Sequence, residues 1–281
     1  MNNKTITNEL INNFKMYLHE EERCDNTIQK YLRDIRFFRE WLQGRDIDKS
    51  SVIEYKNELC SRYAAKSVNS MLSSINAFFM FMGWYELKIK TLKIQRHIFT
   101  DKSRELTKPE YERLLIAAKS KKNERLYYLM QTIASIGLRV SEIKYITCEA
   151  VAQGQAVINC KGKIRQVLLP KKLCKILKGY IKSQNIKSGS VFITKSGRPL
   201  DRCAIWKMLK KLCETAGVSK DKVFPHNFRH LYARTFYALE KDIVRLADIL
   251  GHSSINTTRI YTMETGETHR RQLQRLHLLH C

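Results

Sequence analysis

Residues 86–105, ELKIKTLKIQRHIFTDKSRE, constrain the fold most, because they interrupt the helical apolar periodicity that runs on both sides of them. They show no sustained helical period and are rich in basic side chains. A stretch of this kind is typical of an exposed linker between domains. We therefore predict a helical domain over residues 1–85, a basic interdomain linker over 86–105, and a second domain over 106–281.

The first predicted domain consists of helices. Apolar residues recur every three or four positions in four segments, which begin near Thr7, Asp25, Lys49 and Ser67. The second segment carries a basic face opposite its apolar stripe, made by Lys30, Arg33, Arg36 and Arg39. This face suits contact with a phosphate backbone, and an ordinary solvated face explains it equally well.

The second predicted domain combines helices with a small sheet. A capping box, Thr107-Lys-Pro-Glu110, starts a helix, and further helices are predicted at about 123–136 and from residue 200 onwards. Residues 155–160 and 164–169 are predicted to form a hairpin, with a third strand at Ser190–Thr194. The expected fold class is mainly α with a small β-sheet, the second domain being α+β.

Net charge indicates the class of partner. The chain holds 51 Lys and Arg against 27 Asp and Glu, a formal net charge of +24, and most of the excess lies in residues 101–281. Such an excess attracts polyanions, of which nucleic acid is the commonest in a cell. With no long apolar run and no signal-peptide layout, we expect a cytoplasmic protein without a membrane partner. The candidate DNA-binding residues are Lys30, Arg33, Arg36, Lys66, Lys88, Lys90, Lys93 and Arg96.

No metal site is expected. The 8 cysteines form no CxxC pair, so we interpret them as reduced thiols. His226 and His230 are spaced to share a helical face, but no glutamate lies between them as in a zinc-binding HExxH motif.

Four short motifs of the second domain carry residue types suited to one reaction. They are SIGLRVSEI at 135–143, CKGKI at 160–164, FPHNFRHLYART at 224–235 and DILGHSSINTTRIYT at 248–262. Taken singly, each has an ordinary structural reading: an ion pair, a basic turn, a helix start and a core tyrosine. The chain has 13 tyrosines, so only the ordered series selects one of them.

In this order the motifs resemble those of the tyrosine recombinases, or phage integrase family. The resemblance covers nearly the whole chain and implies a helical SAM-like core-binding domain followed by a catalytic domain. The six active-site positions then fall on Arg139, Lys161, His226, Arg229, His252 and Tyr261.

The implied activity is that of a site-specific DNA recombinase, which cleaves and rejoins strands through a 3′-phosphotyrosyl intermediate. Tyr261 is the expected nucleophile, Arg139 and Arg229 hold the phosphate oxygens, and His226 is the candidate base. Lys161 is the candidate acid, with Lys163 as its rival because the turn looks one residue shorter than in the family. His252 is expected to donate a hydrogen bond to the phosphate, and Glu142 to orient a neighbouring residue. No metal ion or ATP is required.

Two other readings remain open from the sequence, a topoisomerase of type IB and a DNA-binding regulator without catalysis. The family resemblance also implies a tetramer on DNA. The tail, residues 264–281, suits docking on a neighbouring subunit and equally suits packing on its own domain. The DNA target, any accessory proteins, and the distinction between a mobile-element integrase and a chromosome-dimer resolvase are left open.

Overall fold

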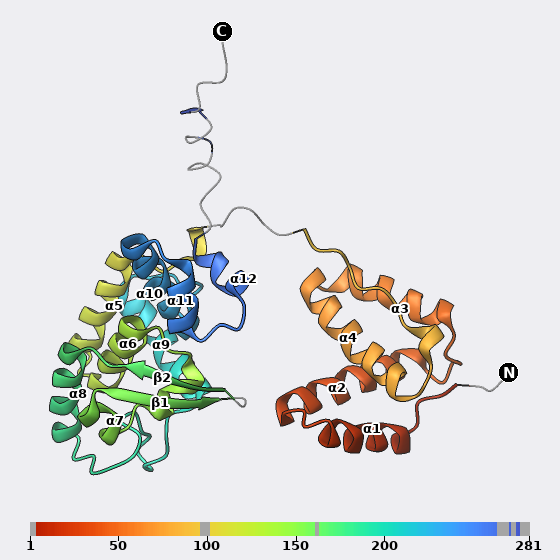
Figure 1. Ribbon diagram of the computed structural model, residues 1–281, viewed down its shortest axis with the longest axis horizontal. Helices are drawn as coiled ribbons and strands as arrows, with labels where there is room; N and C mark the ends of the chain where they lie inside the picture. Colours follow the sequence, from red (N-terminus) through yellow and green to blue (C-terminus); the bar gives the residue numbers. More distant parts are fainter. Residues whose placement is uncertain (1–3, 96–101, 161–162, 263–269, 271–273, 276–281) are drawn as a thin grey trace, which may run out of the picture. The chain divides into compact units, whose positions relative to one another are not determined.

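The chain divides between Arg96 and His97 into two units, each with its own hydrophobic core (Figure 1). The computed structural model describes residues 4–95, 102–160, 163–262, 270, 274 and 275. It is mainly helical with a small sheet, so the predicted fold class is confirmed. In the described part of the chain, no helix has the length and hydrophobicity that crossing a bilayer would require.

Unit 1 is a bundle of four helices, as the apolar periodicity predicts. The apolar stripe on the second helix is buried along its whole length, since its five large residues are at most 3% exposed. Asp48 and Ser51 form a capping box at the start of the third helix. The helices are α1 (Asn8–Glu20), α2 (Asp25–Leu42), α3 (Lys49–Arg62) and α4 (Ala65–Phe81), followed by a short 3₁₀ turn η1 (Tyr85–Leu87).

The ends of the predicted linker pack against the two units. Leu87 and Ile89 are buried in the core of unit 1, and Asn76 binds the Ile89 backbone through both its amide oxygen and its amide nitrogen. At the other end, the Arg104 carbonyl accepts from the Asn227 amide at 2.7 Å, and Leu106, just beyond the linker, is buried in the core of unit 2. Apolar and basic residues alternate after residue 86, so one side of this extended segment can be buried while its lysines stay exposed.

Unit 2 packs helices against one face of a two-stranded hairpin, whose other face is exposed. Figure 1 shows α7 and α8 beside the hairpin, and α10, α11 and α12 grouped together. Its elements up to the hairpin are η2 (Lys102–Arg104), α5 (Lys108–Ser120), α6 (Glu124–Ile136), η3 (Val140–Tyr145) and α7 (Cys148–Gln153). The remainder are β1 (Gln155–Cys160), β2 (Lys163–Leu168), α8 (Lys171–Ser183), α9 (Arg202–Ala216), α10 (Pro225–Glu240), α11 (Ile243–Leu250), α12 (Ile255–Thr258) and η4 (Arg259–Tyr261).

The predicted hairpin is present, but the predicted third strand is wrong. β1 and β2 pair in antiparallel register from Gln155 with Leu168 to Cys160 with Lys163. The segment at Ser190–Thr194 instead makes only isolated bridges, Thr147 with Ser190 and Ile193 with Pro199. Because its backbone groups bond to two different neighbours, no continuous ladder forms along it.

Candidate active site

Arg229 is the largest fully buried side chain of the site. Pro225 occupies the first turn of α10, where proline needs no hydrogen-bond acceptor, and Arg229 follows one turn later with 0% exposure. Its Nη1 donates to the Gly137 carbonyl at 2.6 Å and its Nη2 to the Leu250 carbonyl at 2.8 Å. These bonds fix the guanidinium between the carboxyl ends of α6 and α11.

Arg139 and Glu142 form a pair at the start of η3. Arg139 donates to Glu142 from its backbone N–H at 2.8 Å and from Nη1 at 2.9 Å, while its Nη2 donates to the Gly251 carbonyl at 3.2 Å. Glu142 is 1% exposed, whereas the Arg139 side chain is 38% exposed. The carboxylate thus orients Arg139 and leaves part of its guanidinium open to solvent.

Arg165 of β2 is the second cation on Glu142. Its Nη2 donates to Glu142 at 2.8 Å and its Nη1 to the Ile249 carbonyl at 2.5 Å. Gly251, which ends α11 with φ +64°, lies directly against this side chain. A Cβ at position 251 would come within 2.6 Å of the Arg165 Cδ, so the close approach and the left-handed backbone both require glycine.

His252 lies between Arg229 and Thr258. Its Nε2 is 2.9 Å from the Arg229 Nη2, and its Nδ1 is 2.8 Å from the Thr258 hydroxyl. Thr258 is the last residue of α12 and is 0% exposed. Both nitrogens of the ring are therefore held by side chains of unit 2.

Tyr261 is packed among aromatic and histidine rings. It is 5% exposed and belongs to a small apolar cluster with Ala233, Leu246 and Leu250. The His230 ring meets it edge-on with centroids 4.9 Å apart, and the His252 ring is stacked at 6.1 Å. His230 also packs on His226, at 4.6 Å, so the two histidines and the tyrosine form a continuous row.

Burial and mutual repulsion lower the pKa values of the site's bases. Burial, followed by the nearby Arg139, lowers the pKa of Arg229 to about 10, against the opposing effect of Tyr261. Burial and the charges of Arg229 and Arg139 lower the pKa of His252 to about 4. Burial and the charges of Arg229 and Arg139 also lower the pKa of His226. At neutral pH both histidines are neutral, while Arg229 remains a cation.

Five of the six predicted active-site residues lie in the described part of unit 2, and direct contacts link most of them. Arg229 binds His252, whose ring stacks on Tyr261, and both arginines bind carbonyls at the end of α11. Lys161 lies outside the described residues, as do Arg96 and most of the tail 264–281. Lys163 is the first residue of β2 and pairs with Cys160 across the hairpin.

The motifs do not reveal three side chains that hold the site together: Arg165, His230 and Thr258. Arg165 binds Glu142, which is 23 positions away in sequence, so only the packing of the hairpin against η3 reveals the contact. The sequence pattern suggests a role for His230 only as a metal ligand, although its position one turn after His226 already predicts ring contact. Thr258 looks in the sequence like part of a polar connection.

The candidate DNA-binding cations of unit 1 differ in whether groups of the unit itself already bind them. The ammonium group of Lys30 is bound by Asp34, Ser74 and the Ser70 carbonyl, so its charge is directed into the unit. Arg33 also pairs with Asp34, but its side chain is 60% exposed. The remaining described candidates, Arg36, Lys66, Lys88, Lys90 and Lys93, are exposed.

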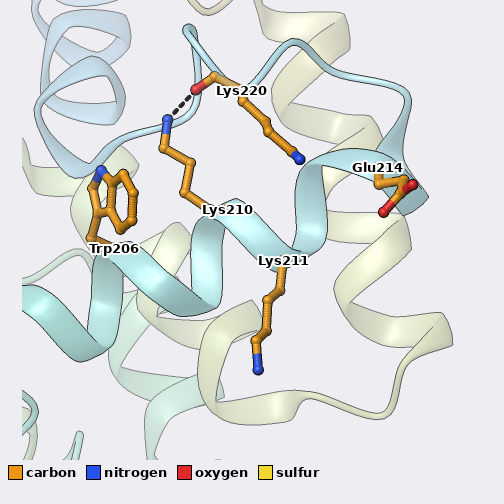
Figure 2. Close-up of a pocket in the computed structure, with 5 residues that line it drawn as sticks. All are labelled: Trp206, Lys210, Lys211, Glu214 and Lys220. Atoms are coloured by element: carbon orange, nitrogen blue, oxygen red, sulfur yellow. Dashed lines mark hydrogen bonds between the residues drawn. The ribbon is translucent and has the colours of Figure 1, made fainter.

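A further basic hollow, which the motifs did not predict, lies on α9 (Figure 2). Lys210 donates to the Lys220 carbonyl and lies 5.2 Å from the centre of the Trp206 ring. Figure 2 shows Lys211 pointing away from this pair, on the opposite side of the helix. Trp206 is 48% exposed, so the hollow presents an aromatic surface beside cations.

Comparison with known proteins identifies similar sequences along nearly the whole chain. The model of the phage integrase family matches residues 104–267, and that of the phage integrase N-terminal SAM-like domain matches residues 11–85. Tyrosine recombinase XerA of Thermococcus kodakarensis is 30% identical over 97% of this chain and 96% of that protein. Tyrosine recombinase XerA of Pyrococcus furiosus is 28% identical over 99% of this chain and 98% of that protein. A lambda integrase tetramer bound to a Holliday junction has a similar fold, with a TM-score of 0.70 and 17% identity over 92% of this chain and 78% of that chain.

Proposed function

We propose, from the premise that the chain belongs to the phage integrase family and is a tyrosine-type site-specific recombinase, that Tyr261 is the residue that cleaves DNA. The observation that carries the proposal is the chain of contacts from Arg229 through His252 to Tyr261. Among the described tyrosines, Tyr261 is the one in contact with the histidines of two of the four motifs. The comparisons favour a recombinase over a type IB topoisomerase or a regulator without catalysis.

The proposed cleavage transfers the phosphoryl group from the 5′ oxygen of the DNA to the oxygen of Tyr261. The Tyr261 hydroxyl oxygen attacks the phosphorus, the bond to the 5′ oxygen breaks, and the 3′ phosphate stays linked to the tyrosine. His226, neutral because its pKa is lowered, accepts the proton of the phenol. The reverse attack by a 5′ hydroxyl of the partner strand restores the DNA backbone and releases the tyrosine.

The two arginines are proposed to stabilise the charge that develops on the non-bridging oxygens. Arg139 keeps part of its guanidinium exposed, which leaves donors for a phosphate. The Nε of Arg229 is buried and has no hydrogen-bond acceptor among the described residues. Because an unpaired buried donor is costly, a phosphate oxygen that accepts from it would be bound strongly.

The leaving 5′ oxygen needs a proton donor, and we propose Lys161, with Lys163 as the alternative. Replacing each lysine separately by alanine and supplying a 5′-phosphorothiolate substrate tests this assignment. A sulfur leaving group needs no proton, so the cleavage defect of the true acid variant is rescued. The variant that this substrate does not rescue is not the acid.

The proposed substrate is duplex DNA bearing two recombination sites, on which the protein assembles as a tetramer in the cytoplasm. The strongly basic unit 2 and the fold shared with the lambda integrase tetramer support this assembly. Unit 1 is proposed as the core-binding domain, in which the exposed cations Arg33, Arg36 and Lys66 face the DNA. The tail, residues 264–281, is the proposed contact with a neighbouring subunit.

Covalent trapping tests the nucleophile. The protein is incubated with a library of nicked suicide duplexes that carry randomised arms, and the adduct is isolated under denaturing conditions and mapped by peptide mass spectrometry. We expect DNA on the peptide containing Tyr261, no adduct with Tyr261→Phe, and an undiminished adduct with the exposed control Tyr63→Phe. An adduct that persists in Tyr261→Phe would refute the assignment.

A further inference from the structure

The end of the interdomain linker is bound along one face of α10. Asn227 donates from its side-chain amide to the Arg104 carbonyl at 2.7 Å. Two turns later, Arg234 donates from Nη2 to the Leu106 carbonyl at 2.7 Å, and its Nη1 lies 3.0 Å from the Glu105 carboxylate. Residues seven apart share one face of a helix, so the linker end follows the helix that carries two of the proposed active-site residues.

Asn227 joins three segments of unit 2. Its amide nitrogen also donates to the Lys222 carbonyl, at 2.7 Å, in the turn that precedes α10. An amide nitrogen has two N–H donors, so both are used. Because Asn227 is only 3% exposed, these two bonds are shielded from water. The amide thus connects the linker end, the turn before α10 and the first turn of α10 itself.

The first turn of α10 depends on this amide because no side chain caps the start of the helix among the described residues. The N-cap position is Phe224, which offers no side-chain hydrogen bond to the helix N–H groups. His226 follows in the first turn, and within the described part of the chain its ring packs on His230 and makes no hydrogen bond. The place of the His226 ring is therefore set by the backbone that Asn227 holds.

We propose that Asn227 is a positioning residue that holds the first turn of α10 against the linker end, and thereby places the ring of His226 for its part in cleavage. The inference rests on the proposed role of His226 as the base. It adds the end of the linker to the segments that support the active site. Since the contact is made to the backbone carbonyl of Arg104, it depends on the course of the linker and not on the side chain at that position.

Loss of the amide should affect His226 more than Arg229. Without it, the linker end and the preceding turn are no longer joined to the first turn of α10. Arg229 keeps its own bonds to the Gly137 and Leu250 carbonyls, whereas His226 has no comparable bond among the described residues. A general base must lie within hydrogen-bond reach of the proton that it accepts, so a small displacement of the ring lowers the rate.

The first measurement is the pKa of the His226 ring in the free full-length protein, by NMR titration. Burial lowers this pKa, and so do the charges of three neighbouring cations, Arg229, Arg139 and Arg202. In Asn227→Ala the pKa should rise toward the ordinary value of about 6.5, because a displaced ring is less buried and farther from these cations. Asn76→Ala removes the corresponding amide contact at the other end of the linker and should leave the pKa unchanged. An unchanged pKa in Asn227→Ala would overturn the proposal.

The second measurement is the single-turnover rate of covalent adduct formation at saturating protein. His226→Ala should lower this rate by about 10²-fold or more, the usual contribution of a general base. Asn227→Ala should lower it by about tenfold, and should have no further effect in the His226→Ala background, because the amide acts through that ring. An equal further loss there would refute the positioning role and leave the base assignment intact. A native rate in His226→Ala would instead refute the base.

A second variant covers the case in which Asn227→Ala does not fold, which chemical denaturation would reveal. Glu105→Gln weakens the attachment of the linker end to Arg234 and leaves no space in the core. It should lower the rate of adduct formation by about threefold, the effect of one weakened ion pair, and should have no effect in the His226→Ala background. A native rate in Glu105→Gln would then overturn the proposal.

Discussion

In the described part of each unit one carboxylate is buried between two cations, and the two clusters differ in where the cations direct their remaining donors. Asp34 of unit 1 is 0% exposed and pairs with Lys30 and Arg33; Glu142 of unit 2 is 1% exposed and pairs with Arg139 and Arg165. The three donors of the Lys30 ammonium all meet acceptors of the unit. Arg139 has five donors, and its side chain remains 38% exposed. The buried carboxylate of unit 1 therefore pairs with a lysine whose donors are all used within the unit, whereas that of unit 2 pairs with an arginine that keeps part of its guanidinium exposed.

Removing one cation from each cluster gives the largest expected difference between the two units. Arg139→Ala should slow adduct formation by about 10²- to 10³-fold, because it removes donors to the charge of the transition state. Lys30→Ala should leave the rate per folded molecule nearly unchanged and lower the free energy of unfolding by about 1–3 kcal/mol, because Asp34 loses a buried partner. Single-turnover cleavage and chemical denaturation measure the two effects. Equal losses of rate in both variants would contradict the contrast.

Replacing each buried carboxylate by its amide tests the same difference between the two clusters. Glu142→Gln should slow adduct formation by roughly 10- to 100-fold, because it loosens Arg139, whose misplacement is costly in a preorganised site. Asp34→Asn is the matched variant and should affect unfolding alone. Crystal structures of both variants would show whether Arg139 has moved. A native cleavage rate in Glu142→Gln would mean that Gly251 alone holds Arg139.

The close packing of Arg165 on Gly251 is tested against a second helix-ending glycine. Gly217 ends α9 at φ +59°, and a Cβ added there would meet nothing within 4 Å, whereas Gly251 at φ +64° lies against Arg165. Gly217→Ala should cost about 1 kcal/mol of unfolding free energy for the backbone alone. Gly251→Ala should cost about 1–3 kcal/mol more, because Arg165 must move. If the two variants were equally stable, Arg165 would not be held rigidly.

Acid should destabilise unit 2, which contains His230 and His252, more than unit 1. Burial and the neighbouring His226 and Arg234 lower the pKa of His230 to about 3, and that of His252 is about 4. Between pH 6.5 and 4 the unfolded chain binds protons at these rings while the folded chain does not, so stability falls as pH falls. Hydrogen exchange at pH 7 and pH 5 should show greater loss of protection in α10 and α11 than in α2. In His230→Phe the protection of these helices should depend less on pH. Equal loss of protection in both units would contradict the prediction.

The sequence could predict what depends on local periodicity and on motif order. The helices of unit 1 follow from their apolar stripes, and the ordered motifs make Tyr261 the candidate among the 13 tyrosines, which the structure brings beside His230 and His252. It could not predict the contacts that join distant segments. Arg165 resembles any other cation of a basic strand until the fold brings it to Ile249, 84 positions away. The strand predicted at Ser190–Thr194 failed for the same reason, because its β-forming composition does not specify which neighbours its backbone meets.

Because Tyr261 is buried, a reagent that modifies exposed tyrosines can detect when its phenol becomes accessible. At 5% exposure it should resist a tyrosine-nitrating reagent in the free protein, while Tyr63 and Tyr85, at 51% and 62%, are modified quickly. If Tyr261 is the nucleophile as proposed, a bound phosphate has to reach its phenol oxygen, and we expect the contacts with His230 and His252 to change when DNA binds. Nitration footprinting can therefore detect that opening independently of cleavage, and can rank DNA sequences by how readily they induce it.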